Sequence, residues 1–577
     1  MNRARRYRRI SFVLATLCFV LVQRGYGTTY RVDCGTPSIA NTSPDKPLNT
    51  IAQVNGLQLG AGDTLLFKRG TTCKGTLQPH GSGTEAAPIR IAAYGEGSLP
   101  RIIADAANDA ALRLSNEQFW EIQSLDLSGS NTYGILVETA SGTMHHIVLR
   151  DILVHDVRGS LKHKESGLVV IHSTGPSGNF DDILVDGVQA FNTTQWSGIF
   201  ISDAAHVQVL NSIAHDVQGD GIVVFRSQNA VIARSLTWHT GMQHQETLGT
   251  PNAIWTWRCT DCVVEDNEAF LADSPGVDGG AFDIDYGNSH NTVRRNFGHD
   301  TDGYCVSVFA AFGPTTASVV EGNLCRANGL APRLAQRQGA ILLMTWQGGF
   351  IDGLMVKNNR IDWNPSGDTP AVRSGADLRS AGVVLSANEI RSSGISFIDP
   401  GLKYGGNHNT YAVASKMPSD FAAAKVRFLK LPESNSVLRA AEDPAVVSSA
   451  GHRALSTWSL IANVPYDSSE RDRQRAIFVQ LLSAALQFGH AGLRVTLVGN
   501  PDALALAADW QLSAAGIVVK AQAPGAKPFV KLISPAGDVV REWHNYPGPV
   551  DLGSALHGHL GAPNFSFLPF EDVRATD

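Results

Sequence analysis

Short apolar runs with alternating polar positions recur along most of the chain. The clearest copies read GILVET, GLVVIH, GIFISD, GIVVFR, AIWTWR, AFDIDY, YCVSVF and AILLMT, and they begin at positions 134, 167, 198, 221, 253, 281, 304 and 340. Successive side chains of a strand point to opposite faces, so each copy predicts a short strand with one buried face. A single unit is too small to bury that face alone, and the repeats must therefore stack on one another.

A second short apolar run follows each copy and ends at a small polar residue. The members of this polar series are Asp151, Asp186, Asn211, Ser235, Asn267, Asn296, Asn323, Asn359 and Asn388. Their spacing, roughly 24 to 36 residues, is too regular for chance and too variable for a helical repeat. The pattern predicts a long stack of short strands. A β-propeller is the alternative, but its blades are longer and usually carry their own motifs.

These features resemble the right-handed parallel β-helix of the pectin-lyase-like superfamily. The resemblance covers roughly residues 30–415, and the segment GDTLLFKRGTTCKGTL is similar to the N-terminal part of secreted carbohydrate-active members. It implies a mainly β fold in which the polar series forms an inward ladder at one corner of the coil. It also implies that ligands lie across the outward face of one sheet. This fold hosts many activities, so the activity must be argued from the site.

The first 27 residues have the features of a secretory signal peptide. A basic start precedes an apolar run from Ile10 to about Val22, and the small residues Gly25 and Gly27 follow. The run is too short for a comfortable membrane span, so we expect cleavage near Gly27, no stable span afterwards, and a secreted or periplasmic protein. Residues 28–415 are expected to form the β-helix with its N-terminal cap, and residues 416–456 a linker.

The remaining residues, 457–577, follow a different pattern of strand, helix, strand, helix, hairpin and helix. This order resembles a thioredoxin-like domain, with Pro528 where that family carries its cis-proline. The Cys-x-x-Cys of the family is replaced by Tyr466-Asp-Ser-Ser-Glu-Arg-Asp472, and the domain has no cysteine. Thiol-disulfide exchange requires a thiolate, so redox activity is excluded for this module. We expect a binding or packing role with an unknown partner.

Charge and cysteine usage narrow the class of protein. The formal net charge is -6, which gives no reason to expect a nucleic-acid partner. Beyond Cys18 in the leader, six cysteines remain: Cys34, Cys73, Cys259, Cys262, Cys305 and Cys325. An even number in an exported protein favours disulfides. Cys259 and Cys262 have the spacing of a redox or half-zinc motif, but they lie between strands without a second pair, which favours a structural disulfide or buried thiols.

The strand Ala281–Tyr286 is the strongest candidate for chemistry. Phe282 and Ile284 point one way, so Asp283 and Asp285 stand side by side on the opposite face. Aspartate is disfavoured within strands, and like charges at neighbouring positions destabilise a sheet, so these two carboxylates favour a functional role. Asp278 and Asp302 precede strands on adjacent coils and should approach the pair, although each precedes a glycine and also suits a turn.

The resemblance places Trp255 and Trp257 on the outward face, one coil before the aspartates, and Val306 and Val308 one coil after them. Indole rings stack on sugar faces, and crowded carboxylates raise the pKa of at least one member, which supplies a general acid beside an ionised base. Glycoside hydrolysis needs that division. We therefore expect a secreted polysaccharide-degrading glycoside hydrolase with Asp283, Asp285, Asp278 and Asp302 as catalytic candidates and no required cofactor.

Two further functions remain open. A polysaccharide lyase or epimerase acting on a uronate would use Arg226, Arg258, Tyr286 and His299 around the carboxylates, with Ca²⁺ possible at the aspartates. Against it, no lysine falls on the central outward face. The specific sequence strings of polygalacturonases are absent, and Asp283 and Asp285 only faintly resemble the Asp-Pro-His-Asp string of mannuronan C5-epimerases. A non-catalytic protein that binds glycans on this face is the third interpretation.

Overall fold

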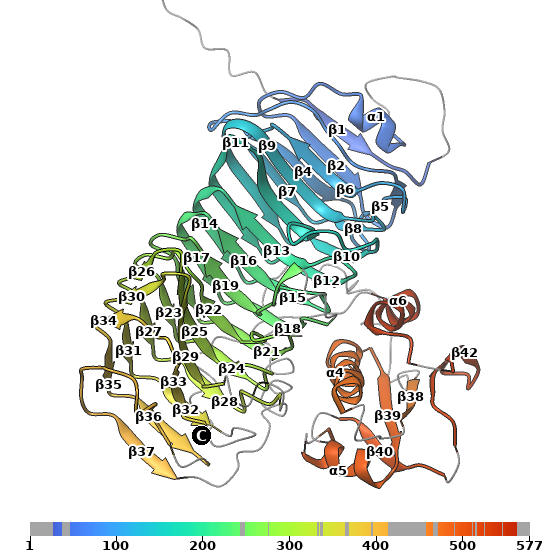
Figure 1. Ribbon diagram of the computed structural model, residues 1–577. Helices are drawn as coiled ribbons and strands as arrows, with labels where there is room; N and C mark the ends of the chain where they lie inside the picture. Colours follow the sequence, from blue (N-terminus) through green and yellow to red (C-terminus); the bar gives the residue numbers. More distant parts are fainter. Residues whose placement is uncertain are drawn as a thin grey trace, which may run out of the picture.

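The computed structural model describes residues 27–36, 47–242, 248–274, 276–331, 334, 338–363, 369–393, 396–413, 457–464, 471–489, 491–509, 512–513, 516–523, 526–544 and 546–561. The signal peptide (apart from Gly27) and the linker expected from the sequence lie outside these residues. The described chain forms a long stack of parallel strands with a smaller α/β unit beside it (Figure 1). Among the described helices, none has the length and apolar character needed to cross a membrane.

The stack consists of three parallel ladders, and the coils between residues 110 and 392 contribute a strand to each of them. The first ladder contains β6 (Ala110–Ser115), β9 (Tyr133–Arg150), β11 (Gly167–Asp186), β13 (Ser197–Ser202), β16 (Ile222–Phe225), β19 (Ile254–Trp257), β22 (Phe282–Ile284), β25 (Val306–Ala311), β29 (Ile341–Trp346) and β33 (Val372–Ser374). The prediction of a parallel coil is confirmed.

The second ladder shares the long strands β9 and β11, which bend and continue through both ladders. Its other strands are β1 (Thr29–Val32), β2 (Thr64–Lys68), β4 (Ile89–Tyr94), β7 (Trp120–Gln123), β14 (Ala204–Leu210), β17 (Gln228–Ala233), β20 (Val263–Glu265), β23 (Thr292–Arg294), β27 (Val319–Glu321), β31 (Met355–Lys357) and β35 (Val384–Ser386). Beside its end lie β26 (Pro314–Thr316), β30 (Phe350–Asp352) and β34 (Ser380–Ala381).

The third ladder is a separate sheet of thirteen strands. It contains β3 (Thr72–Lys74), β5 (Arg101–Ile103), β8 (Asp126–Ser128), β10 (Leu153–Val157), β12 (Gln189–Thr193), β15 (Ile213–His215), β18 (Leu236–Thr240), β21 (Glu268–Ala272), β24 (Phe297–His299), β28 (Leu324–Arg326), β32 (Arg360–Trp363), β36 (Glu389–Ser392) and β37 (Thr410–Val413). At the N-terminal end, the helix α1 (Ile51–Asn55) is capped by Thr50, whose side chain accepts a hydrogen bond from the amide of Gln53.

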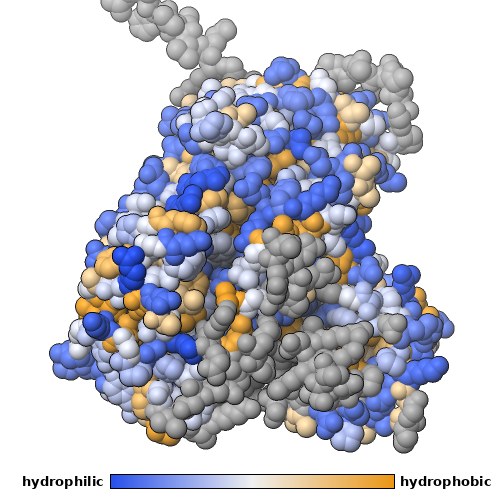
Figure 2. Space-filling model, in the orientation of Figure 1, coloured by the Kyte–Doolittle hydropathy of each residue, from blue (hydrophilic) through white to orange (hydrophobic). Residues whose placement is uncertain are grey.

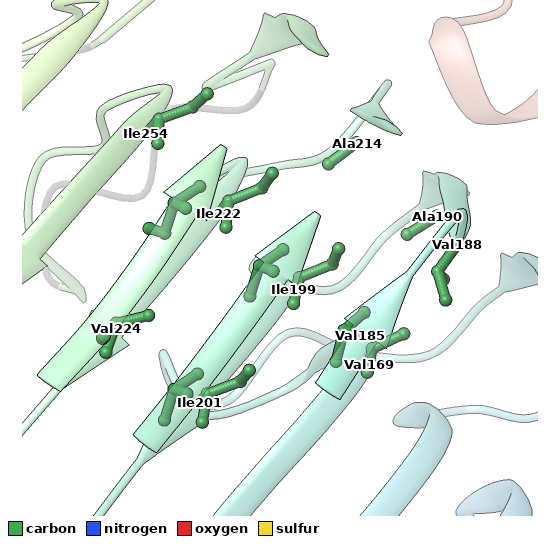
Figure 3. Packing of buried hydrophobic residues seen from close by; sticks show 14 of the residues in the cluster. Val169, Val185, Val188, Ala190, Ile199, Ile201, Ala214, Ile222, Val224 and Ile254 are labelled. Carbon is green, nitrogen blue, oxygen red and sulfur yellow. The ribbon is translucent and has the colours of Figure 1, made fainter. Parts of the chain in front are cut away.

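The interior of the coil is filled by apolar side chains stacked in register. Ile199, Ile222 and Ile254 lie above one another on consecutive strands and are fully buried (Figure 3). Burial of each such side chain contributes about 1.5–3 kcal/mol. The outer surface differs, since apolar patches on the face seen in Figure 2 are interspersed with hydrophilic residues. The coil is therefore held together mainly from within.

The polar ladder at one corner is present, with a corrected membership. Asn267 donates from its side-chain amide to the Oδ1 atom of Asn296, 3.0 Å away, and the pattern repeats through Asn323, Asn359 and Asn388 to Asn409. Ser235 joins it through its backbone amide. The expectation for Asp151, Asp186 and Asn211 is wrong, because Ser212 aligns with Ser235, so Asn211 faces outward and bonds to Asp186 instead.

The six cysteines form three disulfides, Cys34–Cys73, Cys259–Cys262 and Cys305–Cys325. Cys259 and Cys262 are buried in the core of the coil, which makes their spacing a structural feature rather than a metal or redox motif. Three disulfides fit a secreted protein.

The α/β unit has a five-stranded sheet in the order β40-β39-β38-β41-β42. Its elements are β38 (Trp458–Val464), α4 (Arg471–Phe488), β39 (Leu493–Gly499), α5 (Pro501–Asp509), β40 (Val518–Ala521), β41 (Phe529–Ile533), β42 (Val539–Trp543) and α6 (Pro549–Leu560). The strands β38, β39 and β40 are parallel, whereas β41 and β42 are antiparallel to their neighbours. The edge strand β40 is an addition to the order expected from the sequence.

The α/β unit packs on the outward face of the third ladder and shares a hydrophobic core with it. Trp238 of β18 is buried in this core, and its indole N–H donates to the hydroxyl of Ser483 on α4, 3.0 Å away. Asp216 is also buried, and it accepts a 2.6 Å hydrogen bond from the side chain of Gln487. The partner of this unit therefore includes the coil of the same chain.

Candidate active site

The carboxylate pair lies on the first ladder with the orientation that the alternation predicts. Phe282 and Ile284 are fully buried in the core, so the side chain of Asp283 points to the outer side of the sheet. In register, Trp255 lies on one side of Asp283 and Ser307 on the other. Asp285, half-buried, follows the end of β22. Asp283 is itself only 2% exposed, so the pair forms the floor of the site and not an open surface.

The neighbouring strand corrects one part of the expected register. Phe282 pairs with Val306, so Val306 and Val308 face the core, and Ser307 and Phe309 take the outward positions. The prediction that the two valines face outward is wrong because the turn before β25 contains one more residue than the repeat suggests. A slip by one residue exchanges the two faces of a strand.

Asp283 is held by two side-chain donors. The hydroxyl of Ser307 donates to its Oδ1 atom at 2.5 Å, and the amide of Asn252 donates to its Oδ2 atom at 3.1 Å. The Oδ1 atom of Asn252 in turn accepts from the hydroxyl of Tyr304 at 2.8 Å and from the amide of Gly280 at 2.9 Å. Asn252 therefore connects Asp283 to the next carboxylate.

That carboxylate is Asp278, which lies in the loop before β22. Its Oδ2 atom accepts from the hydroxyl of Thr250, and its Oδ1 atom lies 3.1 Å from the hydroxyl of Tyr304. Burial raises the pKa of Asp278 to about 6, although these hydroxyls and the charge of Lys164 act in the opposite direction. Asp278 is therefore poised to change its protonation state near neutral pH.

The other carboxylates of the cluster are shifted in the same direction. Burial raises the pKa of Asp285 to about 8, and the charge of Asp278 adds to this effect. Burial and the charges of Asp285 and Asp278 raise the pKa of Asp283 well above its ordinary value. Since the groups interact, their titrations belong to the cluster as a whole. At neutral pH, Asp285 is protonated while most of Asp278 is ionised.

A fourth aspartate, Asp220, extends the cluster. Its Oδ2 atom accepts a 2.5 Å hydrogen bond from the indole of Trp196, and its Oδ1 atom accepts from the backbone amide of Asn252 at 3.0 Å. Burial raises the pKa of Asp220, whereas the charge of Lys164 lowers it. The Nζ atom of Lys164 lies 5.3 Å from the centre of the Trp196 ring. Lys164 thus places a cation close to the carboxylates.

Aromatic rings line one side of the cluster. Trp255 is 4% exposed and contributes packing, whereas Trp257 is half-buried and stacks on Phe225 with ring centres 4.0 Å apart. Tyr286 meets Trp257 edge-on at 5.3 Å and Trp346 edge-on at 6.0 Å. Trp346 is 38% exposed. Phe312, 65% exposed, meets Tyr286 edge-on at 5.6 Å. The rings of Trp257, Tyr286, Phe312 and Trp346 are therefore accessible to a ligand, and of the two predicted tryptophans only Trp257 is open to solvent.

The two arginines differ in their availability. Arg226 makes a paired contact with Asp203, with Nε–Oδ1 and Nη2–Oδ2 distances of 2.7 and 2.8 Å. This pairing opposes the expectation that Arg226 binds a substrate carboxylate. Arg258 is exposed and lies 5.7 Å from the ring centres of both Trp257 and Tyr286. Arg258 therefore remains the arginine that borders the aromatic side of the site.

The two remaining candidates are held by structural contacts. The expectation that His299 accompanies the aspartates is wrong, because His299 belongs to β24 of the third ladder, where it is fully buried and bonded to Asp300 and Glu268. Asp302 is buried in the turn before β25. Its backbone amide donates to the carbonyl of Ala272, and its Cβ atom packs against Gly279. These contacts support the interpretation that Asp302 stabilises a turn.

The aspartate cluster has little of the geometry expected for Ca²⁺. Calcium takes six to eight oxygen ligands at about 2.3–2.6 Å, and in the described part of the chain no three residues of this cluster bring one carboxylate oxygen each within 4.8 Å of one another. Both oxygens of Asp283 also face hydrogen-bond donors. The residues instead suit proton transfer.

Several members of the site were not predicted from the sequence. They are Lys164, Trp196, Thr250, Asn252, Tyr304, Ser307 and Trp346. Most come from loops between strands, where no period places them. Tyr304 and Ser307 were visible as parts of the YCVSVF copy, and correct alignment of that strand would have identified Ser307 as the outward neighbour of Asp283.

The chain is similar to several known β-helix proteins. The family model described as a right handed beta helix region matches residues 169–361. Among curated proteins, no sequence matches the chain. The solved structure of GH136 lacto-N-biosidase from Eubacterium ramulus is 18% identical, covers 67% of this chain and 68% of that chain, and has a TM-score of 0.44.

Two other solved structures are similar to a lesser degree. The A-module of mannuronan C-5 epimerase AlgE4 from Azotobacter vinelandii is 14% identical over 61% of this chain and 91% of that chain, with a TM-score of 0.41. DFA-IIIase from Arthrobacter chlorophenolicus A6 is 13% identical over 63% and 91%, with a TM-score of 0.36. The family match supports the fold of the central coil, and the activity has to be inferred from the site itself.

Proposed function

We propose that the protein is a glycoside hydrolase that cleaves a polysaccharide at the aspartate cluster of the first ladder. The observation that carries this proposal is the pair of perturbed carboxyls, with the pKa of Asp285 raised to about 8 and that of Asp278 to about 6. One group is protonated and the other ionised at neutral pH, which is the division of labour that glycosidic hydrolysis requires. Trp257 and Tyr286 offer ring faces and edges for the sugar beside it.

In this proposal Asp285 is the general acid and Asp278 the general base. Asp285 gives its proton to the glycosidic oxygen as the bond from that oxygen to the anomeric carbon breaks. Asp278 removes a proton from the water whose oxygen forms the new bond to the anomeric carbon. The two protons balance, and the reaction requires no cofactor. The hydroxyl of Tyr304 holds Asp278 in place.

Asp283 acts as a positioning residue in this scheme. Its hydrogen bonds to Ser307 and Asn252 are satisfied within the protein, and Asn252 also accepts from the hydroxyl of Tyr304, whose oxygen lies 3.1 Å from Asp278. Burial also favours the neutral form of Asp283, because a further buried negative charge is unfavourable in a dry environment.

A uronate-specific lyase or epimerase is the second candidate, and Lys164 is the observation that favours it. No lysine was expected near the outward face, yet the charge of Lys164 lowers the pKa values of Asp220, Asp278 and Asp285. A cation at this position could neutralise a substrate carboxylate, with Arg258 at the other side of the aromatic rings.

The test is activity of the purified protein on a panel of neutral and uronate polysaccharides. New reducing ends without ultraviolet-absorbing unsaturated product support the hydrolase, and loss of that release in Asp285→Asn and Asp278→Asn supports the assigned roles. Unsaturated product, or altered uronate composition without cleavage, supports the second candidate. Binding without turnover in the wild-type protein refutes both and favours a glycan-binding protein.

For the C-terminal unit we propose a thioredoxin-like fold that serves packing and not redox chemistry. The central order β39-β38-β41-β42, with β41 antiparallel to β38, is the support for this fold. Among the described residues no peptide bond is cis, so Pro528 departs from the pattern of that family.

The proposed signal peptide, residues 1–27, would deliver the protein to the periplasm or the medium. N-terminal sequencing of the mature protein tests this proposal.

A further inference from the structure

The helix α6 docks on the third ladder through one polar face. Asp551, Ser554 and His557 are three residues apart and therefore lie on the same side of the helix. Asp551 lies 3.6 Å from Nη1 of Arg158, and the hydroxyl of Ser554 donates to Oδ1 of Asp156 at 2.8 Å. This face brings His557 toward the coil.

His557 meets a histidine and a carboxylate at this junction. His155, Asp156 and His557 each offer one nitrogen or oxygen atom, and these atoms all lie within 4.8 Å of one another. The Nδ1 atom of His155 lies 2.8 Å from Oδ2 of Asp156. On its other side, the Nε2 atom of His155 lies 2.9 Å from Oδ1 of Asp126. The three groups come from two units of the chain that are far apart in sequence.

The ring of His557 lacks hydrogen-bond partners among the described residues. Both of its nitrogen atoms are buried, and neither is bonded to a residue of that part of the chain. The ring centre lies 4.7 Å from that of Phe191 and 5.1 Å from that of Phe488. A buried polar atom without a partner lowers the stability of the fold. A phenyl ring would fill this space without that cost, so the histidine needs another explanation.

The charges at the junction are compatible with a cation beside Asp156. The carboxylates of Asp126 and Asp156 flank one imidazole, His155. Arg101 lies 3.5 Å from Asp126 and pairs with that carboxylate, whereas Asp156 faces the two histidines. A divalent ion bound by neutral His155, neutral His557 and Asp156 would replace the proton between His155 and Asp156. Buried charges are tolerated when they are paired in this way or coordinate a metal.

We propose that His155, Asp156 and His557 bind one divalent transition-metal ion of the zinc class, which fastens the α/β unit to the coil. Two imidazoles and one carboxylate suit such ions, with a water as the remaining ligand. The His155 and Asp156 atoms are 2.8 Å apart, and two tetrahedral ligands about 2.1 Å from one ion are about 3.4 Å apart, so these two atoms would separate by about 0.6 Å on binding. A small approach of the His557 ring completes the set.

The surroundings already have the form of a support for metal ligands. A ligating histidine usually donates its other N–H to a carboxylate, and Asp126 holds Nε2 of His155 in this way. The Oδ1 atom of Asp156 accepts from Asn192 and Ser554, which leaves Oδ2 directed toward His155 and His557. Binding displaces the proton between His155 and Asp156 to solvent.

The experiment is titration of the chelator-treated full chain with Co²⁺ and with Zn²⁺, followed by calorimetry and by the visible spectrum of Co²⁺. We expect one tight site per chain with absorption typical of a low-coordinate nitrogen and oxygen site, and a higher melting temperature with Zn²⁺. His557→Phe keeps the aromatic packing and should abolish the tight site. His559→Phe, on the same helix but exposed, should retain it.

Two further variants keep the proposal testable if His557→Phe does not fold. Asp156→Asn preserves the volume of a ligand and should also abolish the tight site, whereas Asp126→Asn should weaken binding by about 10–100-fold. If all variants bind several ions equally weakly, the ions are bound only by histidines on the surface. That result, absence of binding to the wild-type chain, or an unchanged tight site in folded Asp156→Asn, would overturn the proposal.

Discussion

The pH dependence of hydrolysis follows directly from the two perturbed carboxyls. With the pKa of Asp278 raised to about 6 and that of Asp285 raised to about 8, the base is ionised and the acid protonated only between these values. About 90% of each group is in the required form at pH 7, so kcat/KM should be greatest there. At pH 5 or pH 9 only about 10% of one group is in that form, and kcat/KM should fall about ninefold.

The Asp285→Asn variant separates the two limbs. It removes the group that must be protonated, so the decrease above pH 8 should disappear while the decrease below pH 6 remains. The loss in turnover should reach about 100- to 10,000-fold, the usual contribution of a general acid. A glycoside whose leaving group needs no protonation should recover most of this loss. Asp105→Asn changes an exposed carboxyl outside the site and should leave both limbs in place.

The assay is reducing-end release at constant ionic strength between pH 4 and pH 10, with the folded fraction checked by circular dichroism at each pH. A profile without limbs between pH 5 and pH 9 in the wild-type protein would refute the assigned roles. So would an Asp285→Asn variant that keeps its alkaline limb, or one that is not recovered by an activated leaving group.

Three other outcomes are expected. Trp257→Ala should raise KM about 5- to 10-fold, because loss of an aromatic contact is worth about 1–1.5 kcal/mol, and kcat should change less; an unchanged KM would place the ligand elsewhere. Because the pKa of Asp285 is raised in the folded state, it stabilises the protein below its unfolded pKa, and this contribution is lost as pH rises through about 8. Urea unfolding of Asp285→Asn should therefore depend less steeply on pH between 5 and 8 than that of the wild type. Asp216→Ala leaves donors from Ser483 and Gln487 buried without their acceptor, so it should lower the free energy of unfolding by about 3–5 kcal/mol; an unchanged melting temperature in calorimetry would contradict this.

The coil could be predicted because the two-residue alternation of apolar and polar positions, together with the need to stack the strands, fixes which side chains are buried. Phe282 and Ile284 had to share a face, and that face had to be buried, so the orientation of Asp283 followed. The ladder from Asn267 onward followed as well, since an inward amide at a corner needs partners above and below. Serines replace the ladder asparagines at Ser212 and Ser235. Without an asparagine at that position, the sequence alignment took Asn211, one residue too early.

The rest of the site depended on contacts that no local pattern encodes. Asn252 and Lys164 lie in turns, where the chain is not periodic, and they meet the aspartates only after several coils have stacked. The prediction for His299 was wrong although it has a carboxylate neighbour, Asp300, and lies close to Asp285 in the sequence. However, each coil crosses three ladders, and a shift of about a dozen residues moves a side chain to a different face of the molecule.

The shared core between Trp238 and α4 has a consequence for how the protein can be shortened. Removal of the residues after 413 would expose an apolar surface along the third ladder that includes Ile213, Leu236, Trp238 and Phe270. The truncated protein would expose this apolar surface to solvent and would aggregate through it. The C-terminal α/β unit thus covers the apolar surface of the third ladder and protects the coil from aggregation.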